Sequence, residues 1–180
     1  MSKSKEVITY HHYSRLINKL VCSISKYPRF NKIKYIYGIE RGGLPISVHL
    51  SHYLKIDHIC DKNLLLTSLN SLYPDNLILI VDDICDTGKT FIDLNREYKE
   101  HKKNIVFASL FYKPHAKFKP TFYVQTTTNW IYFPWEPLSE DPNREMYFHL
   151  INKERRNINS FLECVYMFFK SLRKEIKQLF

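Results

Sequence analysis

The sequence lacks several features that would place it quickly in a functional class. It has 4 cysteines in 180 residues but no Cys-x-x-Cys pair, which argues against a zinc ribbon or a dithiol redox motif and favours reduced thiols. No stretch reaches the roughly 18 consecutive apolar residues of a membrane-spanning helix. Residues 1–5 also lack the apolar segment of a secretory signal peptide. We therefore expect a cytoplasmic protein without a membrane span.

Acidic residues are outnumbered by basic ones. The chain has 27 Lys and Arg against 18 Asp and Glu, a formal net charge of +9. This charge favours an anionic partner, which could be a phosphorylated small molecule, nucleic acid or an anionic membrane surface. With 44% hydrophobic residues, the chain is long enough for one real core, and we expect one domain plus an appendage.

The most informative stretch is an apolar run that ends on acidic residues and a hydroxyl-rich turn. Residues 77–81 are all aliphatic, which predicts a strand buried on both faces of a parallel sheet. Asp82, Asp83 and Asp86 follow, and Thr87-Gly88-Lys89-Thr90 then opens a predicted helix. Ligands of parallel sheets bind beyond the carboxyl ends of the strands. Free backbone N–H groups at a helix N-terminus favour a phosphate there.

Two similar motifs do not fit this stretch. A P-loop requires Gly five residues before Gly88, where the chain has Asp83. The acid box that holds magnesium diphosphate in prenyl-chain enzymes lies on a helix, whereas these acids follow a predicted strand. One structural alternative stays open, in which the acids only solvate the strand end and cap the next helix.

Residues 77–90 strongly resemble the phosphoribosyl pyrophosphate (PRPP) signature of the type I phosphoribosyltransferases. The segment 37–44, Tyr-Gly-Ile-Glu-Arg-Gly-Gly-Leu, resembles the pyrophosphate loop of that family. The segment 130–136, Trp-Ile-Tyr-Phe-Pro-Trp-Glu, is similar to the purine-site segment of the small purine enzymes, the xanthine-guanine type in particular. The resemblance covers roughly residues 5 to 142. It implies an α/β fold in which helices flank a mostly parallel central sheet, with a small hood.

The resemblance also implies a reaction, the Mg²⁺-dependent transfer of phosphoribosyl from PRPP to a 6-oxopurine base. Xanthine, guanine and hypoxanthine are the candidate bases, and the products would be a nucleoside 5′-monophosphate and pyrophosphate. Asp82 and Asp83 would hold the ribose hydroxyls and the hydrated metal, and Asp86 would be the catalytic group beside the imidazole side of the base. The expected PRPP-binding residues are Arg41, Gly42, Asp82, Asp83, Asp86, Thr87, Gly88, Lys89 and Thr90.

Three residues match the purine site of the resembling enzymes. Lys113 follows a predicted strand at 104–111 and matches a Lys that faces the exocyclic oxygen of the base. An indole such as Trp130 can stack on a purine, and main-chain groups at Ile131 can read the base edge. A surface Lys113 and a core Trp130 are the structural alternatives.

Periodicity and turn residues predict the other elements. We expect helices over 6–25, 45–54 and 88–103, strands over 34–39 and 56–60, and an edge strand over 118–124. In the family the connection before the PRPP strand, at 61–76 in this chain, carries the mobile hood. Its only cation is Lys62, and Thr67-Ser68 is its best phosphate-facing pair. A metal site formed by His49, His52 and His58 is a weaker alternative to three surface histidines.

Residues 143–180 extend beyond the resembling domain, residues 1–142. They predict an amphipathic helix with a wide apolar face and a basic remainder. Such a helix could pack on its own domain, dimerise, lie on an anionic membrane, or bind a protein or nucleic acid. We expect a homo-oligomer. A second functional hypothesis is that the fold is reused as a regulator or partner-controlled effector associated with nucleic acid.

Overall fold

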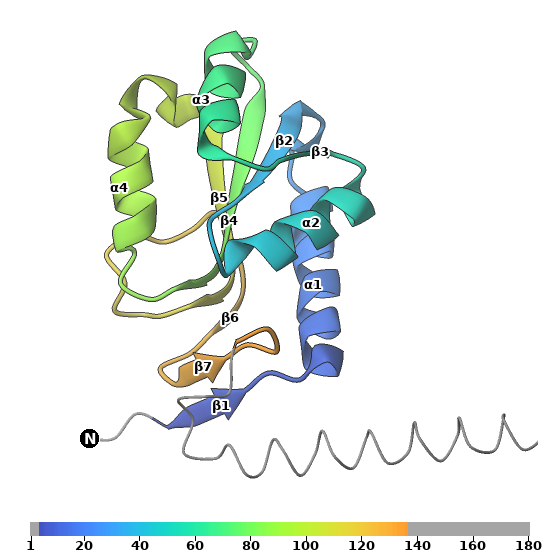
Figure 1. Ribbon diagram of the computed structural model, residues 1–180, viewed down its shortest axis with the longest axis vertical. Helices are drawn as coiled ribbons and strands as arrows, with labels where there is room; N and C mark the ends of the chain where they lie inside the picture. The colour runs from blue at the N-terminus through green and yellow to red at the C-terminus, as the bar shows by residue number, and fades with distance from the viewer. Residues whose placement is uncertain (1–3, 137–180) are drawn as a thin grey trace, which may run out of the picture. The chain divides into compact units, whose positions relative to one another are not determined.

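The computed structural model describes residues 4–136 (Figure 1). The chain divides into two compact units, Met1–Pro134 and Trp135–Phe180. All helices and strands of the described residues belong to the first unit. The predicted extension over residues 143–180, and the predicted boundary at residue 142, lie outside the described residues. Within residues 4–136, no helix is both long enough and apolar enough to cross a membrane.

Two parallel sheets form the strand framework. The main sheet has the order β3-β2-β4-β5-β6, and all of its neighbouring strands are parallel. Its strands are β2 (Ile33–Gly38), β3 (Asp57–Ile59), β4 (Leu77–Cys85), β5 (Ile105–Tyr112) and β6 (Phe122–Thr126). The second sheet pairs β1 (Lys5–Val7) with β7 (Trp130–Tyr132), also in parallel. The predicted α/β fold with a mostly parallel central sheet is therefore confirmed.

Helices cover both faces of the main sheet (Figure 1). Helices α1 (Tyr10–Ser25) and α2 (Gly43–Leu54) lie on one face, and α3 (Lys62–Ser71) and α4 (Lys89–Glu97) lie on the other. Two short 3-10 helices span Phe30–Lys32 and Lys99–Asn104. Helix α1 has one apolar face, because it buries Tyr13, Leu16, Ile17, Leu20 and Ile24.

Strand β4 is the centre of the core. Leu77 to Val81 have no exposed surface, as expected for a central strand that is covered on both faces. On the side of α3 and α4 an aromatic cluster packs against it. The rings of Phe91, Phe107 and Phe118 lie within 5.6 Å of one another, centroid to centroid. This tightly packed centre fixes the position of the acidic residues at the carboxyl end of β4.

The N-terminal segment differs from the helix predicted over residues 6–25. Residues Lys5–Val7 form β1, whose partner Trp130–Tyr132 lies far along the chain, and such long-range pairing leaves no trace in local periodicity. The helix begins only at Tyr10, because the Thr9 hydroxyl caps it by accepting the N–H of His12 at 3.1 Å. The pairing of β1 with β7 therefore joins the beginning of the first unit to its end.

The connection expected to form the hood is a packed helix. Asp61 caps α3 by accepting the N–H of Leu64 at 2.8 Å, and the helix buries Leu65 and Leu69 against the sheet. The prediction that Thr67 and Ser68 face a phosphate is wrong in this structure. The hydroxyl of Thr67 donates to the carbonyl of Asn63 in its own helix, and Ser68 is buried.

Two other boundaries differ from the predictions. The helix predicted over 88–103 ends at Glu97 and continues as a 3-10 helix. Asn104 fixes the end of this segment by donating to the carbonyls of Pro74 and Asn76, both at 2.8 Å. The edge strand predicted over 118–124 is confirmed as an edge, but it begins only at Phe122, because residues 113–118 pack against the turn that follows β4.

The buried position of Leu79 in β4 yields a stability prediction. We expect Leu79→Ala to lower the free energy of unfolding by about 2–5 kcal/mol, since it removes apolar contacts and leaves a cavity. Leu66→Ala on α3, where 46% of the residue is exposed, is the control and should cost much less. Chemical denaturation measures both, and equal losses would contradict this description of the core.

The three histidines considered as a metal site are separate in the structure. His49 contacts the hydroxyl of Tyr13 and the carbonyl of Pro45 through Nδ1, at 2.7 and 2.9 Å. Nε2 of His58 lies 2.9 Å from the Ser47 hydroxyl, and His52 is exposed. Residues 4–136 hold no group of three or more His, Cys, Asp or Glu that could bind a metal. The metal alternative for these histidines is therefore wrong.

His58 yields a prediction on pH. Burial lowers the pKa of His58 below its ordinary value of 6.5, so the unfolded chain binds more protons than the folded one as the pH falls below about 6.5. We therefore expect the unfolding free energy to decrease over that range, and His58→Gln to lose this part of the decrease. The exposed His52→Gln is the control, and denaturation at a series of pH values is the measurement. A His58→Gln profile identical to that of the parent protein would refute the assignment.

Candidate active site

The carboxyl ends of the strands bring most of the predicted site residues to one edge of the main sheet. The loop after β2 contains Arg41 and Gly42, Asp82 and Asp83 lie near the carboxyl end of β4, and the turn after β4 contains Asp86. Strand β5 leads into Lys113, while Trp130 comes from β7 of the second sheet. Because neighbouring strands of a parallel sheet end at the same edge, residues far apart in the sequence meet there.

The glycine-containing loop lies directly on the acidic pair. A Cβ atom at Gly42 would overlap the Asp83 carboxylate, so glycine lets the loop approach this carboxylate without displacing it. The preceding peptide bond, Glu40–Arg41, is cis. Each carboxylate is oriented by the backbone, since Asp82 accepts the N–H of Asp83 at 2.9 Å and Asp83 accepts the N–H of Ile84 at 2.7 Å. Burial and the neighbouring Asp83 raise the pKa of Asp82 well above its usual value.

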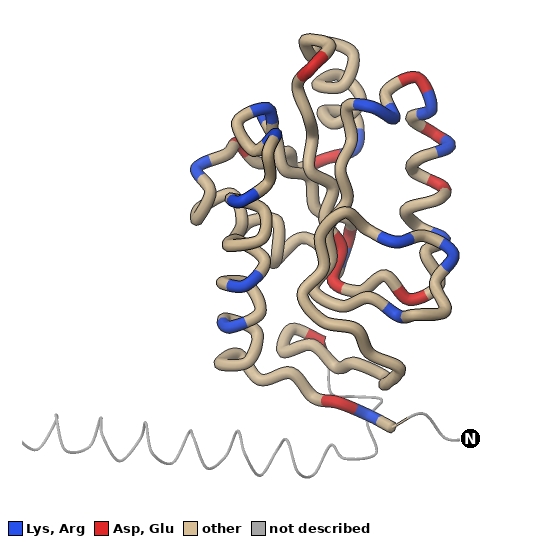
Figure 2. The backbone as a smooth tube through the Cα atoms, turned by 180° about the vertical axis from the view of Figure 1, so that it is seen from behind, with Lys and Arg blue, Asp and Glu red and all other residues tan. Residues whose placement is uncertain are grey.

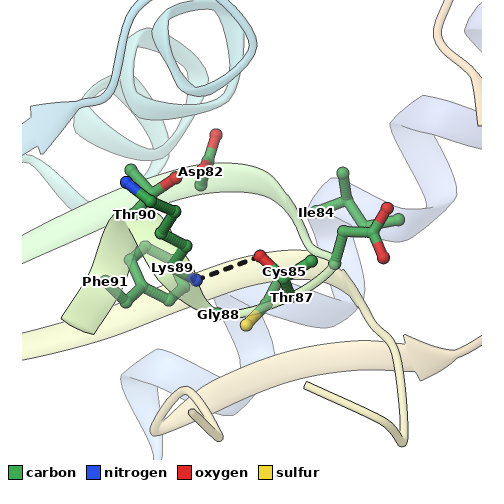
Figure 3. A pocket seen from close by; sticks show the side chains of 9 residues that line it. Asp82, Ile84, Cys85, Thr87, Gly88, Lys89, Thr90 and Phe91 are labelled. Atoms are coloured by element: carbon green, nitrogen blue, oxygen red, sulfur yellow. Dashed lines mark hydrogen bonds between the residues drawn. The ribbon is translucent and has the colours of Figure 1, made fainter. Parts of the chain in front are cut away.

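The turn after β4 surrounds a small hollow of about 70 Å³ (Figure 3). Gly88 has a left-handed backbone with φ of 79° and begins α4, which directs the first backbone N–H groups of the helix toward this region. The Lys89 N–H donates to the Thr87 hydroxyl at 3.2 Å. The Lys89 ammonium pairs with Asp93 at 2.7 Å. Burial and two neighbouring acids raise the pKa of Cys85 to about 11, so its thiol stays protonated at neutral pH.

Lys113 joins two other predicted site residues. Its side chain is only 2% exposed, and its Nζ donates to Oδ2 of Asp86 at 2.9 Å. The same nitrogen lies 5.7 Å from the ring centroid of Trp130, which is a cation–π distance. Three residues chosen from separate parts of the sequence therefore form one cluster.

The structural alternatives for these residues are wrong. Lys113 is buried rather than a surface lysine, and Trp130 is 49% exposed rather than part of the core. Ile131 is buried beside it in β7, in register with Glu6 of β1. An exposed indole and a buried ammonium next to an acid form a surface to which a flat, polar ring could bind.

His115 is a residue of this cluster that sequence reasoning missed. Its Nε2 lies 3.1 Å from Oδ1 of Asp86. It belongs to the turn Lys113-Pro114-His115-Ala116, closed by the Ala116 N–H donating to the Lys113 carbonyl at 2.9 Å. Proline at the second position was the local signal for a turn. The partner of His115 could not be read from that signal, because Asp86 lies 29 residues away.

The chain was compared with protein families, curated proteins and solved structures. Residues 6–141 match the family described as phosphoribosyl transferase domain. No curated protein matches the sequence. A purine phosphoribosyltransferase from Pyrococcus horikoshii is 32% identical, with a TM-score of 0.59 over 74% of this chain and 95% of the other.

Two more distant structures are similar in fold. The Helicobacter pylori xanthine-guanine-hypoxanthine phosphoribosyltransferase is 21% identical, with a TM-score of 0.59 over 73% of this chain and 93% of the other. A hypothetical protein from Neisseria gonorrhoeae with bound ppGpp is 22% identical, with a TM-score of 0.63 over 81% and 96%. The resemblance inferred from the sequence motifs is thereby confirmed.

The ion pair of Lys113 and Asp86 yields a prediction that needs no substrate. In a double-mutant cycle of Lys113→Met and Asp86→Asn, we expect a coupling of about 0.5–3 kcal/mol in the unfolding free energy, as for directly interacting groups. The exposed pair Lys89 and Asp93, one helical turn apart, is the control and should couple much more weakly. Additive effects at Lys113 and Asp86 would show that the two side chains do not interact in solution.

Proposed function

Since the chain belongs to the phosphoribosyl transferase domain family, we propose that it transfers phosphoribosyl from PRPP to a 6-oxopurine. Xanthine, guanine and hypoxanthine are the candidate acceptors, and the products are a nucleoside 5′-monophosphate and pyrophosphate. The observation that best supports a purine is the cluster of Asp86, Lys113 and Trp130, which combines a carboxylate, a buried ammonium and a half-exposed indole. The Pyrococcus horikoshii purine enzyme, at 32% identity, supports the same class of acceptor.

The acidic end of β4 and the turn after it suit PRPP. Asp82 and Asp83 would bind the ribose hydroxyls, and the N-terminus of α4 with Thr87 and Thr90 would bind the 5′-phosphate. The approach of Gly42 to Asp83 puts the backbone of the pyrophosphate loop, with Arg41, beside the acidic pair. Binding energy from the remote phosphate then orients the reacting carbon of the sugar.

The donor set fits Mg²⁺ as the cofactor. Mg²⁺ is usually held by one or two carboxylates together with substrate phosphates and water, and Asp82 and Asp83 supply two adjacent carboxylates at this edge. The bound ion would neutralise charge on the diphosphate as it leaves. Burial and the neighbouring Asp83 raise the pKa of Asp82, and a bound cation would offset the repulsion between the two carboxylates.

Each side chain of the cluster formed by Asp86, Lys113 and Trp130 would have its own role in binding the purine or in the reaction. The Trp130 ring provides a stacking face, and the main chain at Ile131 lies beside it to read the base edge. The ammonium of Lys113 would face the exocyclic oxygen of the base. Asp86 would accept the proton that the base nitrogen loses, or stabilise its charge, as the bond to the sugar forms.

The direct test is pyrophosphate release from PRPP with Mg²⁺ and one base at a time, using xanthine, guanine, hypoxanthine and adenine. We expect release with at least one 6-oxopurine and none with adenine, together with formation of the matching nucleotide. Omission of the base and omission of Mg²⁺ are the controls. Binding of PRPP without release on any base would overturn the proposed transfer.

The role of Asp86 yields a prediction on activity. We expect Asp86→Asn to lower kcat by about 10²–10⁴, the usual contribution of a positioned base, while PRPP still binds with the affinity of the parent protein. Steady-state kinetics and calorimetric binding of PRPP measure the two effects separately. Unchanged turnover would remove the catalytic assignment, whereas loss of PRPP binding would place Asp86 in the PRPP site alone.

A second function is favoured by the charge of the N-terminal segment. Residues 7–39 contain six Lys and Arg and no Asp or Glu, and none of the six forms an ion pair within residues 4–136. Figure 2 shows the cations along α1 and the segment after it, and Lys19 and Lys26 border a shallow depression on α1. Such a surface suits a regulator associated with nucleic acid.

The two functions give opposite results in simple assays. A regulator would bind RNA or DNA with an affinity that falls steeply with salt, and would release no pyrophosphate from PRPP. The structural neighbour from Neisseria gonorrhoeae contains bound ppGpp, so ppGpp is a suitable competitor in the PRPP-binding assay. Competition by ppGpp without turnover would favour the regulator, and turnover with a 6-oxopurine would favour the transferase.

A further inference from the structure

One short segment, residues 113–117, contacts both the side chain of Asp86 and the backbone on either side of it. The N–H of Lys113 donates to the carbonyl of Cys85, and the N–H of Lys117 donates to the carbonyl of Thr87, both at 3.0 Å. These two carbonyls belong to the residues directly before and after Asp86. The segment 113–117 therefore fixes the backbone on either side of the carboxylate.

The side chain of Asp86 is contacted at both oxygens. Oδ2 accepts from the Lys113 ammonium at 2.9 Å, and Oδ1 accepts from Nε2 of His115 at 3.1 Å. The two donors belong to the same turn, in which Pro114 fixes one backbone torsion angle. A carboxylate held at one oxygen can still rotate about that contact, whereas two donors in different directions define its plane.

We propose that His115 is a positioning residue that holds the Asp86 carboxylate in the orientation needed for transfer. This inference rests on the proposed function, because it concerns the group assigned as the base. Lys113 contacts only Oδ2, whereas His115 contacts Oδ1 of the same carboxylate, which is 36% exposed. His115 occupies that oxygen from the solvent side, because its own side chain is 52% exposed.

The position of His115 separates its role from that of Lys113. The buried Lys113 contacts Trp130 as well as Asp86, so its removal would disturb the purine surface and the fold together. The half-exposed His115 contributes little buried area, and its removal should leave the fold and the PRPP site unchanged. Its effect should appear in the chemical step.

The experiment compares His115→Ala, His115→Gln and a control in steady-state transfer to the preferred purine. We expect His115→Ala to lower kcat by about 10- to 100-fold, part of what a positioned base contributes, with KM and affinity for PRPP unchanged. His115→Gln keeps an N–H donor at a similar reach and should restore most of the rate. His101→Ala is the matched control, because Nε2 of His101 also contacts a side-chain oxygen, Oδ1 of Asn70, at 3.1 Å.

The outcomes distinguish the two proposals. If the parent protein transfers phosphoribosyl and His115→Ala equals it, the positioning role is wrong and the proposed function stands. If His115→Ala instead lowers the melting temperature and PRPP affinity together, the role is structural and the inference is again wrong. If the parent protein transfers to no purine, both the function and the positioning role are wrong.

A measurement independent of turnover checks the contact itself. In the histidine side-chain ¹⁵N NMR spectrum, Asp86→Asn should shift the Nε2 signal of His115, because its ionised acceptor has become a neutral amide. The signal of His101 should not move. An unchanged His115 signal would show that the contact with Asp86 does not exist in solution, and would overturn the inference whatever the kinetics.

Discussion

The ion pair between Lys113 and Asp86 is the contact on which the candidate site depends. An ammonium that is almost fully buried must be compensated, since an unpaired buried charge costs several kcal/mol. The protein provides an acid on one side and the electron-rich face of Trp130 near it. Asp86 follows β4, Lys113 follows β5 and Trp130 begins β7, so the two contacts of Lys113 join three strands. The ion pair fixes the orientation of the Asp86 carboxylate and holds the Lys113 ammonium next to the Trp130 ring.

The parallel sheet explains why that contact can form at this edge. Asp82 and Ser109 are in register in β4 and β5, and so are Cys85 and Tyr112, so Asp86 and Lys113 leave adjacent strands at the same level. The second sheet then brings Trp130 to them, because β7 is paired with β1 at the start of the chain. Core packing around Leu77 to Val81 thus sets the geometry of residues that contribute nothing to that core.

Much of the fold could be predicted from the sequence, and so could most of the residues that the fold brings to the carboxyl edge of the main sheet. The aliphatic run at 77–81 is stable only in a strand that is buried on both faces. The acids and the glycine after it identify the edge of the sheet where a ligand would bind. Pairings between distant residues could not be predicted in the same way. Strand β1 exists only through its contact with β7, 125 residues away, and no local pattern contains that information. His115 was missed for the same reason, because its significance lies in the position of Asp86. The helix at 62–71 did have local signals, an Asp at its N-cap and apolar residues four apart, but the expectation of a hood outweighed them.

The packing of α3 bears on how the proposed PRPP side of the site would work. Leu65 and Leu69 fix α3 to the sheet, and Lys62 in its first turn pairs with Glu97 of α4 at 2.8 Å. Lys62 and Thr90 border a hollow of about 260 Å³, which Glu40 of the loop after β2 also lines. A movement of residues 61–76 over this hollow would have to break the ion pair and expose apolar side chains. The helix is therefore better suited as a fixed wall than as a closing lid. Selectivity on this side would then come from a preformed arrangement of backbone and acidic groups, and any segment that closes over a bound diphosphate would have to come from another part of the chain.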